Sequence, residues 1–106
     1  MTSSPPKKEF TLIEYYVPED SDSIEIPNGF GIMKPLEKIT ITDIEENFPL
    51  EGHYHFRFKY KFNNQFVWMD ISNKTCRLPT VDNHIIMKVT RKTWGEKIGI
   101  SIWILI

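Results

Sequence analysis

The stretch His53–Phe62, HYHFRFKYKF, decides how the rest of the chain is interpreted. Aromatic residues at every second position alternate with histidine, arginine and lysine, and a period of two is the period of a β-strand. The aromatic set is Tyr54, Phe56, Phe58, Tyr60 and Phe62, and the polar set is His53, His55, Arg57, Lys59 and Lys61. A face of five aromatic residues has to be covered, so we expect the remaining chain to supply that cover.

Segments on both sides of this stretch also have the composition of strands, rich in aromatic and β-branched residues. They are Phe10–Val17, Gly29–Lys34, Gln65–Ile71 and His84–Arg91. The dipeptide Asn63-Asn64 predicts a tight hairpin turn after the aromatic strand, because asparagine tolerates positive φ, and Asp82-Asn83 predicts another turn. We expect the first two strands to form a second hairpin with a long connection of turn-forming residues.

A short helix is predicted between the two hairpins, and Pro49 ends it. Thr42 can act as the N-cap with Glu45 three residues later, which is the spacing of a capping box. The residues of its apolar stripe, at spacings of three and four, are Ile41, Ile44 and Phe48. The order of hairpin, helix, hairpin and final strand predicts an α+β fold. It is the ubiquitin-like β-grasp arrangement, a mixed sheet of four to five strands with one short helix packed on it.

Length and composition are those of one globular domain. The chain has 106 residues, of which 41% are hydrophobic and 25% charged, so global disorder is not expected. Its one cysteine, Cys76, and the polar N-terminus fit a reducing, cytoplasmic compartment. We expect a disordered arm over residues 1–9, the domain over 10–92, and an apolar tail over 93–106 with the composition of an added strand. The apolar run Ile98–Ile106 is too short to cross a bilayer, which takes about 20 residues, so no membrane partner is predicted.

No catalytic, cofactor-binding or metal site is predicted from the sequence. Zinc needs three or four convergent ligands, and the candidate ligands show no paired motif; they are His53, His55, His84 and Cys76. A nucleophilic cysteine needs a positioned base, and the chain has no nucleotide-binding loop or pair of catalytic carboxylates. We therefore expect a protein that is not an enzyme and takes no small-molecule substrate.

The alternation of aromatic and basic residues over 53–62 is also found in sheet-based RNA binders, where bases stack on aromatic rings. Here, however, the aromatic and basic sets project to opposite faces of the strand, and the net charge is −1. We therefore expect no nucleic-acid partner. In the next strand, Phe66 and Trp68 share one face, and two readings stay open. They either face outward as a binding pair or lie under a neighbouring segment such as the C-terminal tail.

Short matches to one family are spread in order along the chain. They are Tyr15-Tyr16, Ile39–Ile44, Gly52–Lys59, Phe66–Ile71, Leu78-Pro79 and Ile85–Val89. Together, from Tyr15 to Arg91, they resemble the DIX domain of signalling scaffolds such as Dishevelled and Axin. In the helix, Ile44 and Glu45 stand where the family commonly has Phe and Lys.

The resemblance implies a ubiquitin-like fold and head-to-tail self-association, in which the second strand of one copy pairs with the fourth strand of the next. Carried onto this chain, the head side is Phe30, Ile32, Lys34 and Ile44, and the tail side is Phe66, Val67 and Trp68. The implied partners are further copies of the chain and other DIX-like domains, within a scaffold of a signalling assembly. The alternative is a monomeric ubiquitin-like adaptor that binds a different protein through its basic face or the Phe66–Trp68 pair.

Overall fold

The computed structural model describes residues 9–93. In this part of the chain, the strands are β1 (Thr11–Tyr16), β2 (Asn28–Ile32), β3 (His53–Phe62), β4 (Gln65–Met69) and β5 (Ile85–Thr93). The helices are α1 (Ile41–Asn47) and two short 3-10 helices, η1 (Pro18–Asp20) and η2 (Leu36–Lys38). The predictions of a disordered arm over 1–9 and an apolar tail over 93–106 lie outside the described residues, apart from Glu9 and Thr93.

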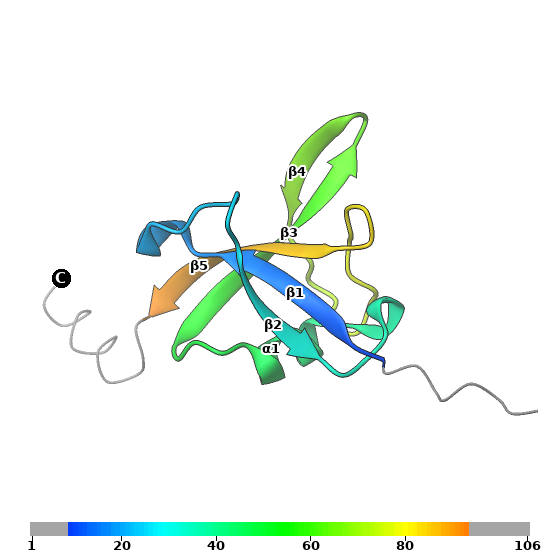
Figure 1. Cartoon of the computed structure of the whole chain (residues 1–106), viewed down its shortest axis with the longest axis horizontal. Helices are drawn as coiled ribbons and strands as arrows, with labels where there is room; N and C mark the ends of the chain where they lie inside the picture. Colours follow the sequence, from blue (N-terminus) through cyan, green and yellow to red (C-terminus); the bar gives the residue numbers. More distant parts are fainter. Residues whose placement is uncertain (1–8, 94–106) are drawn as a thin grey trace, which may run out of the picture.

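The strands form one mixed sheet in the order β2-β1-β5-β3-β4 (Figure 1). β1 and β2 form one antiparallel hairpin, and β3 and β4 form the other. β5 joins the two hairpins, because it runs parallel to β1 and antiparallel to β3. This topology, with one helix against the sheet, confirms the predicted α+β β-grasp fold.

β3 and both tight turns were predicted correctly from the residues within each segment. β3 spans His53–Phe62 as predicted, and Asn63 and Asn64 have φ angles of 49° and 63°, as the hairpin turn requires. Asp82 and Asn83 have φ angles of 50° and 64° in the second predicted turn. The other strands have the predicted places, with ends that differ by at most two residues.

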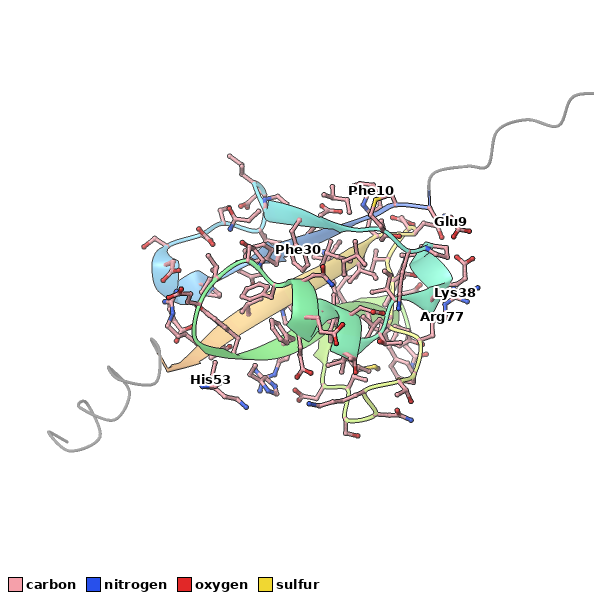
Figure 2. The ribbon with its side chains drawn as sticks, turned by 90° about the horizontal axis from the view of Figure 1, so that it is seen from below. Glu9, Phe10, Phe30, Lys38, His53 and Arg77 are labelled. Atoms are coloured by element: carbon pink, nitrogen blue, oxygen red, sulfur yellow. The ribbon has the colours of Figure 1, made fainter. Side chains whose placement is uncertain are left out.

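The hydrophobic core lies between α1 and one face of the sheet, which we call the helix face (Figure 2 shows the side chains that fill it). The sheet contributes Ile13, Tyr15, Val17, Ile32, Phe58, Ile85, Met87 and Val89, all at most 5% exposed. The covering segments contribute Ile39, Ile41, Ile44 and Leu78. Leu78 is therefore buried in the connection before β5. The opposite surface of the sheet, on which no helix of residues 9–93 packs, is called the helix-free face.

The aromatic face of β3 is covered unevenly. Phe58 is fully buried, and the Tyr54 and Phe56 rings each pack edge-on against Phe48 at centroid distances of 5.0 and 5.1 Å. Phe62, in contrast, is 58% exposed. The reason is that Lys59–Phe62 pairs only with β4, so this end of the hairpin projects past β5 (Figure 1). The expectation that all five aromatics are covered is wrong for Phe62.

The N-cap of α1 is Thr40, so the predicted cap at Thr42 is wrong. The Thr40 hydroxyl accepts a hydrogen bond from the Asp43 N–H, and the Asp43 carboxylate accepts one from the Thr40 N–H, which together form a capping box. Thr42 and Glu45 have the same spacing but lie inside the helix, where Glu45 instead pairs with Lys74 at 3.2 Å. Asp43 prevails over Glu45 because it also accepts a hydrogen bond from Lys34, a contact that the local sequence does not show.

Candidate functional site

The two outer strands of the sheet each leave one backbone edge unpaired within the described residues. β2 pairs only with β1, and β4 pairs only with β3. An open edge carries N–H and C=O groups that can pair with a strand of another chain. The predicted head and tail strands are thus the two strands able to accept such a partner.

The β2 edge, which we call the head, is supported from behind by the core. The Phe30 ring packs against the rings of Tyr15 and Phe48, with centroid distances of 5.8 Å in both cases. Ile32 is only 4% exposed. Both side chains therefore hold β2 in place, and what β2 offers to a partner is mainly its backbone.

The structure places Ile44 in the core, where its side chain has no exposed area. A fully buried side chain cannot contact a second chain in this conformation, so Ile44 does not belong to the head surface. The sequence placed Ile44 on an apolar stripe, and this stripe is the face of α1 that packs on the sheet. The head surface is left with Phe30, Ile32 and Lys34.

Lys34 links the end of β2 to the beginning of α1. Its ammonium group lies 2.8 Å from the carboxylate of Asp43, which is 7% exposed. Burial raises the pKa of Asp43, but the hydrogen bonds from Lys34 and from Thr40 outweigh it and hold the pKa below its ordinary value. Asp43 was not predicted to belong to the head. A local signal for its role in the cap was Thr40, which lies three residues before it.

The β4 edge, which we call the tail, exposes apolar side chains. Phe66 is 55% exposed and Val67 is 36% exposed, on opposite faces of the strand. The ammonium groups of Lys59 and Lys61 lie over the Phe66 ring, 4.5 and 5.9 Å from its centroid. Support for this edge thus comes from its own hairpin, whereas the core supports the head.

Trp68 is half-buried and lies across the helix-free face. Its ring centroid is 5.8 Å from that of Tyr16 in β1, and the ammonium group of Lys88 in β5 is 5.9 Å away. Of the pair Phe66 and Trp68, Phe66 therefore faces outward, whereas Tyr16 covers part of Trp68. The C-terminal tail, which was the other candidate cover, lies outside the described residues.

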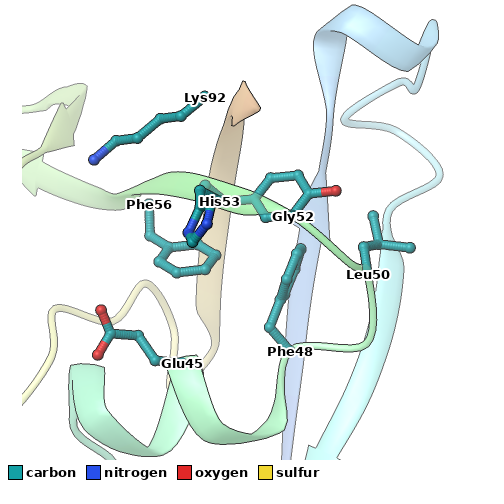
Figure 3. Close-up of a pocket in the computed structure, with 8 residues that line it drawn as sticks. Glu45, Phe48, Leu50, Gly52, His53, Phe56 and Lys92 are labelled. Atoms are coloured by element: carbon teal, nitrogen blue, oxygen red, sulfur yellow. The ribbon is translucent and has the colours of Figure 1, made fainter. Parts of the chain in front are cut away.

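A shallow groove of about 340 Å³ separates α1 from the beginning of β3 (Figure 3). Its lining combines aromatic and aliphatic residues with the ionisable residues Glu45, His53 and Lys92. The complete lining is Glu45, Phe48, Leu50, Gly52, His53, Tyr54, Phe56 and Lys92. None of these residues belongs to β2 or β4, so the groove is separate from both edges.

Two of the histidines considered as metal ligands are paired with carboxylates. His55 and Arg57 both contact Asp70, at 2.5 and 3.3 Å, and His84 contacts Glu14 at 2.5 Å. The hydrogen bond from His55 has the largest effect on the pKa of Asp70, and together with the contact of Arg57 it outweighs burial and holds this pKa below its ordinary value. Among residues 9–93, His, Cys, Asp and Glu side chains do not gather in a group of three or more that could hold a metal ion.

A family model described as the DIX domain matches residues 10–89. Among curated proteins no match is found. Within the part of the chain that the structure describes, no helix is long and apolar enough to span a membrane.

Proposed function

Because the chain belongs to the DIX domain family, we propose that it associates with itself head to tail, through pairing of the head edge β2 with the tail edge β4 of another copy. DIX domains are protein-interaction modules of signalling scaffolds, they associate with other DIX domains, and the family is not one of enzymes. Our proposal is that this chain associates with itself, that it does so through the edges of β2 and β4, and that it is located in the cytoplasm.

One observation carries this proposal: β2 and β4 lie at opposite edges of the same sheet. A contact between unlike edges uses one β2 and one β4 and leaves one of each free at the ends of the pair. Such a contact is heterologous, and it extends into an open filament unless the rotation between copies closes a ring. The proposed head surface is Phe30, Ile32 and Lys34, and the proposed tail surface is Phe66, Val67 and Trp68.

The proposed interface is small, because each strand contributes five residues. Small interfaces are generally weak, so assembly should depend strongly on local concentration. A scaffold gains from this property, since bringing a few copies together in a signalling assembly raises the effective concentration of the remaining edges. The proposed partners are further copies of this chain and other DIX-like domains.

Light scattering over a series of protein concentrations tests the proposal. The mean mass should rise with concentration, and Val67→Asp should suppress the rise, because it places a charge at the tail edge. Leu50→Asp is a matched control, since Leu50 is 37% exposed, like Val67 at 36%, but lies in the loop before β3, away from both edges. Circular dichroism must show that both variants are folded. A strict monomer up to about 1 mM, the scale of weak complexes, would rule the proposal out.

The monomeric adaptor remains the competing function. It predicts a complex of fixed one-to-one stoichiometry with a different protein and no growth in mass with concentration. The same light-scattering series therefore separates the two, and the unpaired edges of β2 and β4 favour self-association.

A further inference from the structure

Exposed apolar side chains gather at both edges of the helix-free face. Next to β2, Phe10 is 55% exposed and Leu12 is 49% exposed. At the other edge, Phe66 in β4 is 55% exposed. All three are on the same face, since Leu12 and Phe66 alternate with helix-face residues of their strands. The apolar patch of Phe10 and Leu12 and the exposed Phe66 ring are therefore at opposite edges of one molecule.

Phe10 and Leu12 extend to the free edge of the sheet because the residues of β2 on this face have no side chains. On the helix-free face, β2 presents Gly29 and Gly31. A Cβ atom on Gly29 would lie 3.1 Å from the Leu12 Cδ1 atom, and one on Gly31 would overlap the Phe10 ring. Both side chains of the β1 segment therefore lie over β2, and their outer surfaces face the position that a neighbouring strand would take.

The sheet topology sets the direction of that neighbouring strand. β1, β5 and β4 run in one direction, and β2 and β3 run in the other. A copy that is added beside β2 with the same orientation continues the sheet, so its β4 runs antiparallel to β2. The helix-free faces of the two copies then form one continuous surface.

Strand length and backbone direction select one register. β2 and β4 each contain five residues, so full overlap pairs Phe30 with Val67, Gly29 with Trp68 and Gly31 with Phe66. In β4, the two-residue turn makes Phe62 and Gln65 a hydrogen-bonded pair, and alternation then directs the backbone groups of Phe66 and Trp68 outward.

The same alternation applies to β2. The Val17 N–H donates to the Asp22 carboxylate at 3.0 Å, and Asp22 also binds Asn28 at 2.7 Å, so the backbone groups of Val17 point toward the β2 side. Because backbone groups alternate in direction along a strand, the backbone groups of Tyr15 and Ile13 also point toward β2. They pair there with the backbone groups of Asn28 and Phe30. The outward groups of β2 are therefore those of Gly29 and Gly31, which stand opposite Phe66 and Trp68.

We propose that, in the head-to-tail contact of the proposed function, Phe10 and Leu12 of one copy pack against Phe66 of the next across an antiparallel β2–β4 seam in this register. The glycines allow Phe10 and Leu12 to lie over β2, so that their outer surfaces meet the aromatic ring of the neighbouring β4 across the strand pair. This second layer of contact adds apolar burial to the backbone pairing, and it includes Phe10 and Leu12, which lie outside both edge strands.

Cysteine cross-linking tests the direction and register. In a Cys76→Ser background, the double variant Asn28→Cys/Met69→Cys should form a ladder of covalent multimers on oxidation, because these positions are opposite each other in the antiparallel seam. The matched control Asn28→Cys/Gln65→Cys places the second thiol at the other end of β4 and should cross-link at least about tenfold less. Equal ladders, a stronger ladder from the control, or no ladder from a chain that self-assembles would overturn the seam. A chain that does not self-assemble at all would instead overturn the proposed function.

A side-chain substitution tests the apolar layer. Phe66→Ser should raise the dissociation constant of self-association about tenfold, the loss expected for an aromatic contact at the centre of an interface. Phe62→Ser is the matched control, because Phe62 is 58% exposed on the same hairpin but on the other face, and it should leave the constant unchanged. Phe10→Ser should reproduce the effect of Phe66→Ser, and the two changes together should cost less than the sum of both. Unchanged association in Phe66→Ser, or full additivity, would contradict the contact even if the chain still self-assembles through its backbone edges.

Discussion

The two free edges of the sheet differ in what holds them. The head strand β2 carries Phe30 and Ile32 into the core and is tied to α1 through Lys34 and Asp43. The tail strand β4 is the outer half of a hairpin whose end projects beyond β5, and Phe66 and Val67 are exposed there. A substitution at the head should therefore cost more folding stability than one at the tail, where the main effect should be on association.

Ile32→Ala should have the largest effect on stability. The side chain is 4% exposed, and truncating a buried isoleucine typically costs about 3 kcal/mol, because burial is lost and a cavity remains. Urea denaturation at a concentration where the chain is monomeric measures this loss. Val67→Ala, at the tail, should cost less than about 1 kcal/mol in the same assay. Equal losses at the two positions would remove the distinction between the edges.

Asp43→Ala should cost about 2 kcal/mol in free energy of unfolding, because it removes the cap of α1 and the partner of Lys34. Glu46→Ala, an exposed position of the same helix, should change stability by less than about 0.5 kcal/mol. Both are measured by urea denaturation. A loss at Glu46 as large as that at Asp43 would mean that helix propensity, and not the link to the head, explains the result.

Acid should weaken the link between α1 and the head. The pKa of Asp43 is held below its ordinary value of 3.8 in the folded chain. Its contribution to stability is therefore fully present above the unfolded pKa and is lost as the pH falls through the folded pKa. In Asp43→Asn, stability measured by urea denaturation should fall less between pH 5 and pH 2, estimated from the range over which carboxylates titrate. An unchanged pH dependence in this variant would contradict the role of the carboxylate.

Asn64→Val should destabilise the tail hairpin by about 1 kcal/mol. Asn64 has a φ angle of 63°, and a β-branched residue is strained in this left-handed region. Asn64→Gly keeps the turn and is the control. Amide hydrogen exchange should show lower protection in β4 and unchanged protection in β1 and β5, because the core does not depend on this turn. Loss of protection throughout the sheet would show that the tail is coupled to the core.

Lys59→Met should have the smallest effect, about 0.5 kcal/mol or less. The Lys59 ammonium lies 4.5 Å from the Phe66 centroid at the surface, where such contacts are weak. Lys61→Met should have a smaller effect still, since its ammonium is 5.9 Å away. Calorimetric melting temperatures compare the two variants. A larger loss in Lys61→Met would contradict this ranking.

The sequence allowed the correct prediction of those features that depend on neighbouring residues. The alternation in His53–Phe62 identified β3 with both ends, and the tolerance of asparagine for positive φ identified the turn at Asn63-Asn64. The order of these elements was enough to predict the mixed sheet and the single helix. The choice of β2 and β4 as the candidate edges came from the family resemblance and not from the order of the elements.

Features that depend on distant residues were missed. Two threonines, each with an acidic residue three positions later, allow two caps for α1, and the contact of Lys34 with Asp43 supports the cap that forms. The apolar stripe of α1 predicted that Ile44 packs on the sheet, whereas the family resemblance put Ile44 on the head surface, and its complete burial agrees with the stripe. Phe62 is apolar and in phase with Phe58, yet it lies past the end of β5 and stays exposed. The contact of Trp68 with Tyr16 joins strands from the two hairpins, so no local pattern predicts it.

The position of β5 at the centre of the sheet has a consequence for synthesis. Among the described strands, β5 is the last to leave the ribosome, yet it is the strand that joins the two hairpins. Until it is inserted, β1 and β3 are also unpaired on one side, and a nascent chain exposes more open edges than the finished domain. Non-local pairing of this kind folds slowly and is prone to aggregation. A domain whose function is to pair edges should therefore rely on rapid completion of its own sheet to confine pairing to β2 and β4.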